Sequence, residues 1–339
     1  MNMTKAQLLQ KDLFDAILRK EKSDGINELC ELLHLKRSAI YKRLNGQKQL
    51  TLDELLLLSE HYQFSIDKVL SNTSGKAIFD FPALNGPPRS YEEFYGSILN
   101  DMEIYSQIPG CRVSYVSTDI PIFHYFYFPE LTAFKMFIWS RTNWEWPSLE
   151  RAYFSSQTLL KQYPVAPIYR RMLDIYLDLP SIELWNANIL DNTINQIQYY
   201  ASSGIFKEPK EAYTLCKQLH ELVEHFMNMA YTGRKFMPGD SKRKERGEFQ
   251  LYHNEITYCT NIVLAETDHG NLVFANYDNP NFMRSREENV INYTIEWFTK
   301  LKRRSLKISG EGERNRVQFF RTLENRVWEL ERYLEQLLG

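Results

Sequence analysis

Five basic residues stand close together in a stretch of the chain that contains no acidic residue. They lie between positions 35 and 52 and are Lys36, Arg37, Lys42, Arg43 and Lys48. Lysine and arginine side chains bind phosphate groups, and polar side chains in the first turn of a helix can contact base edges in the major groove of DNA. This stretch is therefore a candidate nucleic-acid interface.

Two short helices joined by a turn are predicted to carry these residues. The first has an apolar face at the spacing i, i+3, i+4, i+7, formed by Ile26, Leu29, Cys30 and Leu33. After a turn over residues 34–36, Ser38 is predicted to cap the second helix, which turns Ile40 and Leu44 inward. Gly46 is predicted to end that helix because glycine readily adopts a positive φ.

From about residue 5 to residue 70 the chain resembles the lambda-repressor-like (XRE-type) helix-turn-helix of transcriptional regulators. Cys30 stands where that family has a small residue at the helix crossing, Leu35 is the aliphatic residue after the turn, and Ile40 is the β-branched residue that follows. Two positions depart from the pattern. His34 replaces the usual glycine and would need a left-handed backbone, and Arg43 replaces an apolar residue.

The resemblance implies that the second helix enters the major groove of an operator. The residues that it implies for DNA binding are Arg37, Ser38, Tyr41 and Lys42 toward the groove, with Lys36, Asn45 and Lys48 nearer the backbone. A single helix-turn-helix reads only a half-site, so a homodimer is expected.

The chain has 339 residues, which is enough for two or three domains. We predict a mainly α protein, with a five-helix domain over residues 1–70, a linker over 71–89, and a larger helical α+β domain over 90–339. A sub-boundary is expected in the basic loop near 233–247. The predicted β content of the large domain is a small antiparallel element near its C-terminal end, from strands at 249–253, 260–266 and 272–277, whereas 182–203 is predicted to be helical.

The final predicted helix, residues 313–338, carries a heptad seam. Its members step by three and four residues and are Phe320, Leu323, Val327, Leu330, Leu334 and Leu337. This seam could form a two-stranded dimerisation helix, or it could pack on its own domain. The sequence leaves both alternatives open.

Catalytic and metal-binding motifs are not recognised in the sequence, so no catalytic residue, metal or cofactor is predicted. The four cysteines are far apart and none belongs to a C-x-x-C pair, which is typical of a reduced, cytoplasmic protein. The most apolar stretch, residues 120–139, is interrupted by charged residues and prolines, so no membrane association is expected. The net charge of −2 means that any DNA contact must come from a local basic patch.

The sequence therefore favours a bacterial transcriptional regulator that is not an enzyme, in which the large domain holds a dimer together and senses a small molecule or a protein effector. Two alternatives remain. In the first, the protein is an interaction or defence component whose helix-turn-helix docks a partner protein. In the second, it is an enzyme of unknown chemistry that the helix-turn-helix localises.

Overall fold

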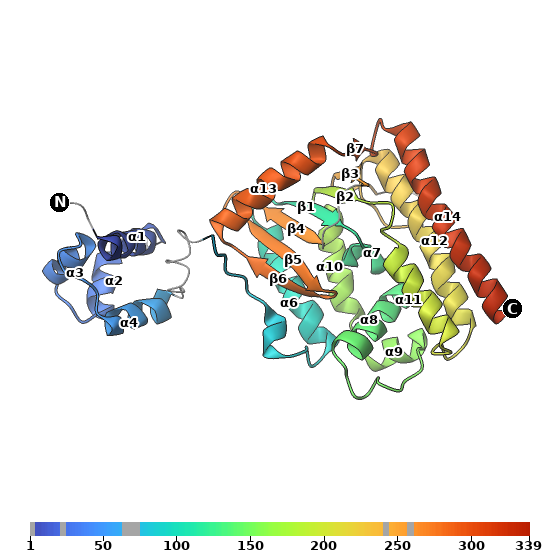
Figure 1. Cartoon of the computed structure of the whole chain (residues 1–339), viewed down its shortest axis with the longest axis horizontal. Coiled ribbons are helices and arrows are strands. Elements are labelled where there is room, and N and C mark those ends of the chain that lie inside the picture. Colours follow the sequence, from blue (N-terminus) through green and yellow to red (C-terminus); the bar gives the residue numbers. More distant parts are fainter. Residues whose placement is uncertain (1–3, 21–24, 63–74, 240–243, 256–260) are drawn as a thin grey trace. The chain divides into compact units, whose positions relative to one another are not determined.

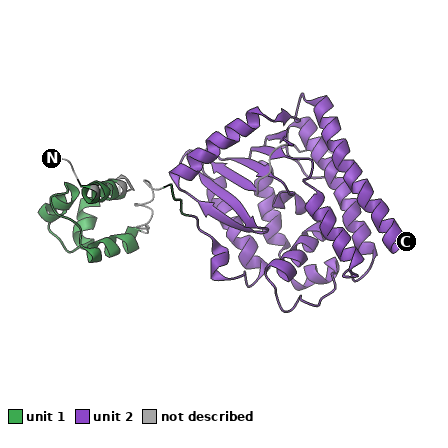
Figure 2. Ribbon diagram, viewed as in Figure 1, with its two compact units in different colours: residues 1–78 green, residues 79–339 purple. Residues whose placement is uncertain are grey.

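The computed structural model of the chain describes residues 4–20, 25–62, 75–239, 244–255 and 261–339. It divides into two units, residues 1–78 (unit 1) and residues 79–339 (unit 2), which Figure 2 colours separately. The division falls inside the interval 71–89, which the sequence analysis assigns to the linker.

Unit 1 has four helices in its described part: α1 (Lys5–Lys20), α2 (Gly25–Leu32), α3 (Arg37–Leu44) and α4 (Leu52–Tyr62). Apolar side chains from all four enclose one core, in which Phe14, Leu29, Ile40 and Leu58 are fully buried. This is the packing expected of amphipathic helices that are too short to be stable alone. The predicted fifth helix, before residue 70, falls outside the described residues.

The turn between α2 and α3 relies on a residue in the left-handed region. His34 has a φ of 51°, and the next amide, that of Leu35, donates to the Cys30 carbonyl at 2.9 Å. A side chain disfavours this conformation, so His34 accepts some strain to close the turn. At the other end of α3, Gly46 has a φ of 69°, as predicted.

The predicted N-cap of α3, Ser38, is wrong by two residues. The helix begins at Arg37, its N-cap is Lys36, and no side chain caps it. Ser38 therefore lies within the first turn of α3, where its side chain is exposed.

Unit 2 is built around a mixed sheet with the strand order β6-β5-β4-β1-β2-β3-β7. Its described strands are β1 (Arg112–Ser117), β2 (Ser181–Trp185), β3 (Phe249–His253), β4 (Ile262–Glu266), β5 (Leu272–Asp278), β6 (Asn281–Ser285) and β7 (Leu306–Lys307). Neighbouring strands β1, β2 and β3 run parallel, and the outer strands pair antiparallel. The prediction of a small antiparallel element is therefore wrong, although the α+β class holds.

The strand β2 overlaps the start of the segment predicted as a helix over 182–203. Parallel strands flank it on both edges, and four of its five residues are buried. Its polar residues Ser181 and Glu183 are buried too, so it is not the apolar run typical of a strand between parallel neighbours. The helix begins only at residue 191, so the short buried run was assigned to the wrong element.

Helices cover both faces of this sheet. They are α6 (Tyr91–Ser106), α7 (Ile122–Tyr125), α8 (Pro129–Ile138), α9 (Ser156–Gln162), α10 (Ala166–Asp178), α11 (Asp191–Ser202), α12 (Lys210–Thr232), α13 (Glu288–Arg303) and α14 (Glu313–Leu338), with a 3-10 turn η1 (Pro82–Asn85) and a π-helical turn η2 (Trp139–Asn143). Figure 1 shows α13 lying along one face of the sheet. On that face Leu184, Leu264 and Val273 pack with Phe298, whereas the opposite face belongs to the larger helical core.

The heptad seam of α14 packs within unit 2, against α12 and α11. Five of its six residues, Phe320, Leu323, Val327, Leu330 and Leu334, are completely buried. Contacts such as the hydrogen bond from the Tyr213 hydroxyl to the Leu334 carbonyl, at 3.1 Å, join the two helices. This packing corresponds to the second alternative for the seam, and it leaves only Leu337, 42 % exposed, available to another chain.

The expected sub-boundary near 233–247 falls inside unit 2. There the Lys235 ammonium is fully buried and donates to the Tyr176 and Leu179 carbonyls at 2.9 and 2.7 Å. Arg246 pairs with Asp174 and Asp178 on α10. In the described residues, no helix is long and apolar enough to cross a membrane.

Candidate functional site

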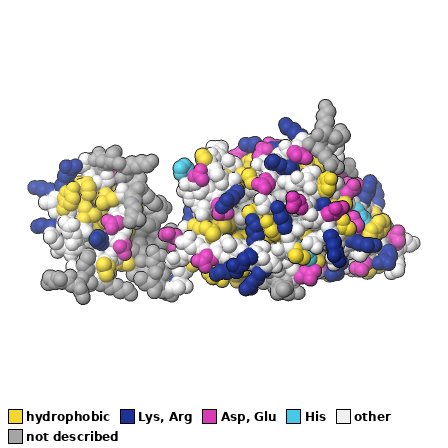
Figure 3. Space-filling model, turned by 90° about the horizontal axis from the view of Figure 1, so that it is seen from above, with side chains coloured by type: hydrophobic (Ala, Val, Ile, Leu, Met, Phe, Trp, Pro, Cys, Tyr) yellow, Lys and Arg dark blue, Asp and Glu magenta, His cyan; other side chains and the backbone are white. Residues whose placement is uncertain are grey.

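The exposed side of α3 carries the residues that the helix-turn-helix resemblance assigns to DNA. Every one of the seven is solvent-exposed: Lys36, Arg37, Ser38, Tyr41, Lys42, Asn45 and Lys48. Figure 3 shows lysine and arginine side chains along the edge of unit 1 at which Figure 1 places α3. The helix thus presents one polar face with no carboxylate on it, while Ile40 on its other face enters the core.

One of the basic residues of the stretch does not belong to this surface. Arg43 is only 2 % exposed, and its guanidinium donates to both carboxylate oxygens of Glu54, at 2.5 and 3.0 Å. Burial alone would raise the pKa of Glu54, but the hydrogen bonds from Arg43 and from the Thr51 amide hold that pKa below its usual value. Arg43 therefore joins α3 to α4 at a position where the helix-turn-helix resemblance predicts an apolar residue.

Helix α1 fixes the C-terminal end of α3 through a glutamine that the sequence analysis did not single out. The buried Gln10 amide donates to the Arg43 carbonyl at 2.6 Å and to the Lys48 carbonyl at 2.8 Å, and it accepts from the Leu50 amide. No local pattern reveals this role, because the partners lie more than thirty residues away in sequence. The loop that carries Lys48 is thereby held rigidly against α1.

Arg37, at the start of α3, is also oriented. Its Nε donates to the Asn27 side chain at 3.0 Å, and the terminal guanidinium nitrogens make no hydrogen bond with the described residues. These two nitrogens are consequently available to an acceptor outside unit 1.

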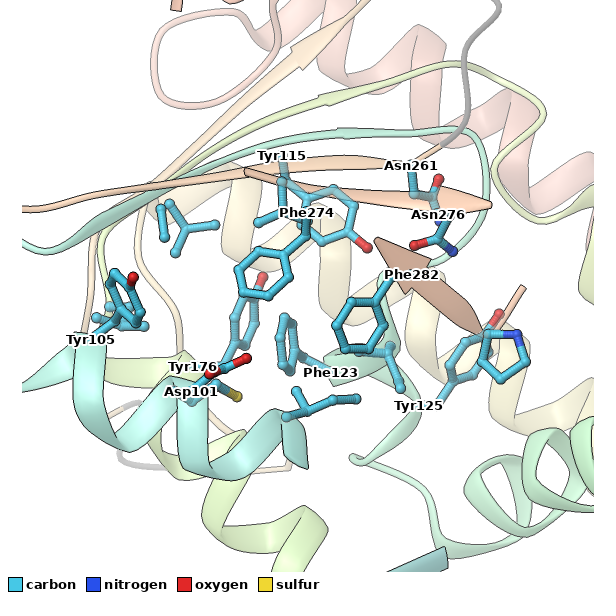
Figure 4. A pocket seen from close by; sticks show the side chains of 18 of the residues that line it. Asp101, Tyr105, Tyr115, Phe123, Tyr125, Tyr176, Asn261, Phe274, Asn276 and Phe282 are labelled. Atoms are coloured by element: carbon cyan, nitrogen blue, oxygen red, sulfur yellow. The ribbon is translucent and has the colours of Figure 1, made fainter. Parts of the chain in front are cut away.

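Unit 2 contains a second candidate site, a pocket of about 140 Å³ between the sheet and the helices above it. Nine of its 23 described lining residues are aromatic, and Figure 4 shows several of them converging on the same space: Tyr115, Phe123, Tyr125, Tyr176, Phe274 and Phe282. This site was not predicted from the sequence, because its residues range from position 94 to position 282.

Strand register explains why these residues meet. Tyr115, Val263 and Phe274 lie opposite one another on β1, β4 and β5, so all three point to the same face. Two residues further along, Asn261 on the edge of β4 and Asn276 on β5 form the next row. The pocket floor is therefore one face of the sheet, and α6 and α7 form its roof.

A buried carboxylate lies behind one end of the pocket. Asp119 accepts hydrogen bonds from Asn192 at 2.8 Å, from Asn279 at 3.0 Å and from the Tyr125 hydroxyl at 3.3 Å. The buried Lys135 ammonium lies 3.9 Å from the same carboxylate, and burial lowers the pKa of that lysine. Asn279 and Tyr125 line the pocket, so Asp119 positions two of its polar groups.

A second buried polar network lies under the pocket and reaches it through Tyr176. The Glu183 carboxylate, fully buried on β2, accepts hydrogen bonds from Tyr176 at 2.5 Å, Ser181 at 3.0 Å and Trp185 at 3.1 Å. Burial alone would raise the pKa of Glu183, but the donors and charges around it lower that pKa. Burial also lowers the pKa of the neighbouring His124. Since both groups are closed to solvent, they stabilise the core rather than offer a reactive surface.

The described residues that line the pocket include no histidine, lysine or serine. They do include Cys111, but burial raises the pKa of its thiol, which is the opposite of what activates a cysteine nucleophile. Among the described residues, no group of three or more histidine, cysteine, aspartate or glutamate side chains is arranged to hold a metal ion.

Comparisons of the chain with models of known protein families, with curated proteins and with solved structures each found no match.

Proposed function

We propose that this protein is a sequence-specific DNA-binding transcriptional regulator in which α3 enters the major groove of an operator. The observation that carries the proposal is the division of α3 into two faces. One face holds the exposed residues Arg37, Ser38, Tyr41 and Lys42 and no carboxylate, while the other is held to the unit by Ile40 and Arg43. A helix fits the major groove, and a rigid helix keeps its side chains in register with the bases.

The positions of Arg37 and Lys48 suggest a contact for each. Arg37, held by Asn27, can present its two terminal nitrogens to guanine, which is the commonest specific contact of arginine with DNA. Tyr41 and Lys42 follow one turn later on the exposed side. Lys48, on the loop fixed by Gln10, is suited to a phosphate of the backbone.

A homodimer is part of the proposal, because two half-sites are needed for the affinity and specificity of an operator. The heptad seam of α14 does not supply the dimer contact, since five of its six residues are already buried in unit 2. Another surface of the chain must therefore hold the two copies together.

The experiment is selection of bound sequences from a random pool of double-stranded DNA with the full-length protein near physiological salt. Salt matters because binding through phosphates alone weakens steeply as salt rises. An enriched palindrome supports the proposal, and its half-site spacing gives the separation of the two α3 helices. Lys42→Ala, on α3, should weaken binding to the enriched sequence. Lys11→Ala, which removes an exposed lysine on α1, is its matched control.

The second candidate is a protein-interaction module, and the exposed leucines of α4 favour it. Leu52 is 70 % exposed, Leu56 45 % and Leu57 43 %. Apolar side chains gathered on a surface often mark a contact with another protein. If folded protein enriches no DNA sequence and a second protein co-purifies through these leucines, this candidate replaces the first.

A further inference from the structure

The pocket of unit 2 has the size of a site for a small organic molecule. Its volume is about 140 Å³. An engineered cavity of ~150 Å³ lined by apolar side chains binds benzene. A molecule of roughly six to ten non-hydrogen atoms is therefore the right size for this pocket.

The wall residues select against charge. The pocket is lined mostly by aromatic and aliphatic side chains, and the lining residues in the described part of the chain include no lysine or arginine. Its one charged lining residue, Asp101, is already paired with the Arg284 guanidinium at 2.7 Å. An anionic ligand would meet no lysine or arginine among the described lining residues and would lie near the Asp101 carboxylate, so a neutral molecule is favoured.

Two polar groups in the pocket have no partner among the described residues. Tyr115 is only 6 % exposed, yet its hydroxyl makes no hydrogen bond with the described residues. Figure 4 shows this hydroxyl directed toward the side where Asn276 and Phe282 lie. The Asn276 side-chain amide is likewise without a partner in the described part of the chain. Buried polar groups in native proteins are usually satisfied, so the Tyr115 hydroxyl is suited to a polar group of a ligand, and the half-buried Asn276 amide can serve the same group.

The same strands that wall the pocket hold the start of unit 2. Asp80 and Arg284 exchange backbone hydrogen bonds of 2.8 and 2.9 Å, which attaches residue 80 to the edge of β6. The Phe81 ring contacts Tyr277 on β5, with ring centroids 5.2 Å apart. Arg284 also binds Asp101 of the pocket wall. The segment through which the chain connects to unit 1 is thus anchored on the pocket's own strands.

We propose that this pocket binds a small, uncharged, mostly apolar molecule with one hydrogen-bonding group, which Tyr115 and Asn276 recognise, and that β5 and β6 convey its presence to residues 79–81. The binding part stands on the pocket alone. The regulatory part rests on the proposed function, because it makes this molecule the effector of operator binding.

Binding is tested on the full-length protein by isothermal titration calorimetry with p-cresol and indole as neutral probes. The control is 4-hydroxybenzoate, which replaces the methyl group of p-cresol by a carboxylate. The neutral probes are expected to bind, and the anion is expected to bind at least about tenfold more weakly, which corresponds to about 1.4 kcal/mol. Failure of both neutral probes, or stronger binding of the anion, overturns the proposal.

Two variants place the bound probe. Tyr115→Phe keeps the shape of the pocket and is expected to weaken p-cresol binding by about three- to tenfold, the loss of one neutral hydrogen bond. Val263→Phe should fill the pocket and abolish binding, whereas Val317→Phe, at a residue of α14 that is 53 % exposed, is the matched control and should bind normally. Unchanged binding in both pocket variants would show that the probe binds elsewhere, which overturns the assignment.

The link to the start of unit 2 has its own measurement, hydrogen exchange at the amides of Asp80 and Arg284. Saturating p-cresol is expected to slow exchange at both amides several-fold relative to the Phe154 amide, which is bonded to the Ile205 carbonyl. Binding without this change overturns the link. If DNA selection fails but p-cresol still binds, the proposed function falls and the pocket assignment stands. If both succeed, p-cresol should change operator affinity at least threefold, and no change overturns its role as an effector.

Discussion

The exposed face of α3 and the pocket of unit 2 are assembled in opposite ways. The face draws on residues between positions 36 and 48, and most of them lie on one helix. The pocket draws on residues between positions 94 and 282, from strands and helices that only the sheet brings together. A helix places neighbouring residues on one side by its own geometry, whereas a pocket wall exists only once the strands are in register.

The two sites also differ in where their polar groups lie. Among the described residues of unit 1 the lysine and arginine side chains are exposed except that of Arg43, which is buried against the partly exposed Glu54. Unit 2 buries several titratable groups that contact lining residues of its pocket, among them Glu183, Lys135 and His124. Substitutions on α3 should therefore separate binding from stability, whereas substitutions of the buried polar groups in unit 2 should change stability first.

The largest effect is expected for Arg43→Ala, which tests whether Arg43 has a structural role that its neighbour Lys42 lacks. In the wild-type protein the Glu54 side chain is 14 % exposed. Removing Arg43 leaves its carboxylate without the guanidinium partner, so the variant should lose about 3–5 kcal/mol of unit 1 stability. The adjacent Lys42→Ala should change stability by no more than about 0.5 kcal/mol. Chemical denaturation followed by circular dichroism measures both. Equal stability of the two variants would contradict the structural role of Arg43.

The next effect is a loss of stability in acid that comes from unit 2. Burial lowers the pKa of His225 to about 3, from 6.5, so the folded protein keeps this residue neutral while the unfolded chain takes up a proton. Stability is therefore retained above pH 6.5 and decreases as the pH falls toward 3, with a slope of about 1.4 kcal/mol per pH unit from this group.

His225→Phe keeps an aromatic ring beside Tyr127 and Phe236 but cannot titrate. Its denaturation free energy, measured between pH 7 and pH 4, should fall less steeply than that of the wild-type protein. Parallel curves for the two proteins would rule out His225 as a source of the acid sensitivity.

A moderate effect is expected on DNA binding by the exposed face itself. Arg37→Ala should weaken binding to the selected operator by about 1–3 kcal/mol and relax the preference at one base pair, while Lys42→Ala should weaken it without unfolding the protein. Fluorescence anisotropy with labelled operator measures both, and Lys11→Ala should bind like the wild type. Wild-type affinity in both α3 variants would remove Arg37 and Lys42 from the interface.

The smallest effect concerns the turn before α3. Replacing His34 by glycine relieves the cost of a side chain at a φ of 51° but adds freedom to the unfolded chain. The two effects nearly offset each other, so His34→Gly should leave unit 1 unchanged or stabilise it by up to about 1 kcal/mol. A thermal unfolding scan suffices. A clear loss of stability would mean that the imidazole makes a contact that the turn needs.

The local elements of the α3 surface are the part that the sequence could predict. The apolar spacing that ends in Leu33, the positive φ at Gly46 and the left-handed turn at His34 all follow from residues a few positions apart. The N-cap of α3 was predicted at Ser38 but is Lys36, because no side chain caps that end of the helix. Arg43 was recognised as unusual, but its partner Glu54 belongs to another helix, so the ion pair was not predicted.

In unit 2 the sequence indicated a helical majority, and its most apolar stretch, residues 120–139, contains α8, whose residues 131–138 are all buried. It could not determine the sheet, because β2 is a short segment that contains Ser181 and Glu183, and its hydrogen-bond partners on the parallel neighbours lie some seventy positions away on either side. Nor could it decide between the two alternatives for the seam of α14, since an apolar stripe is the same whether it meets its own domain or another chain. The sequence determines the local periodicity of each helix and strand. Only tertiary packing decides which partner each apolar face meets, and it also forms the pocket lined by Tyr115 and Asn276.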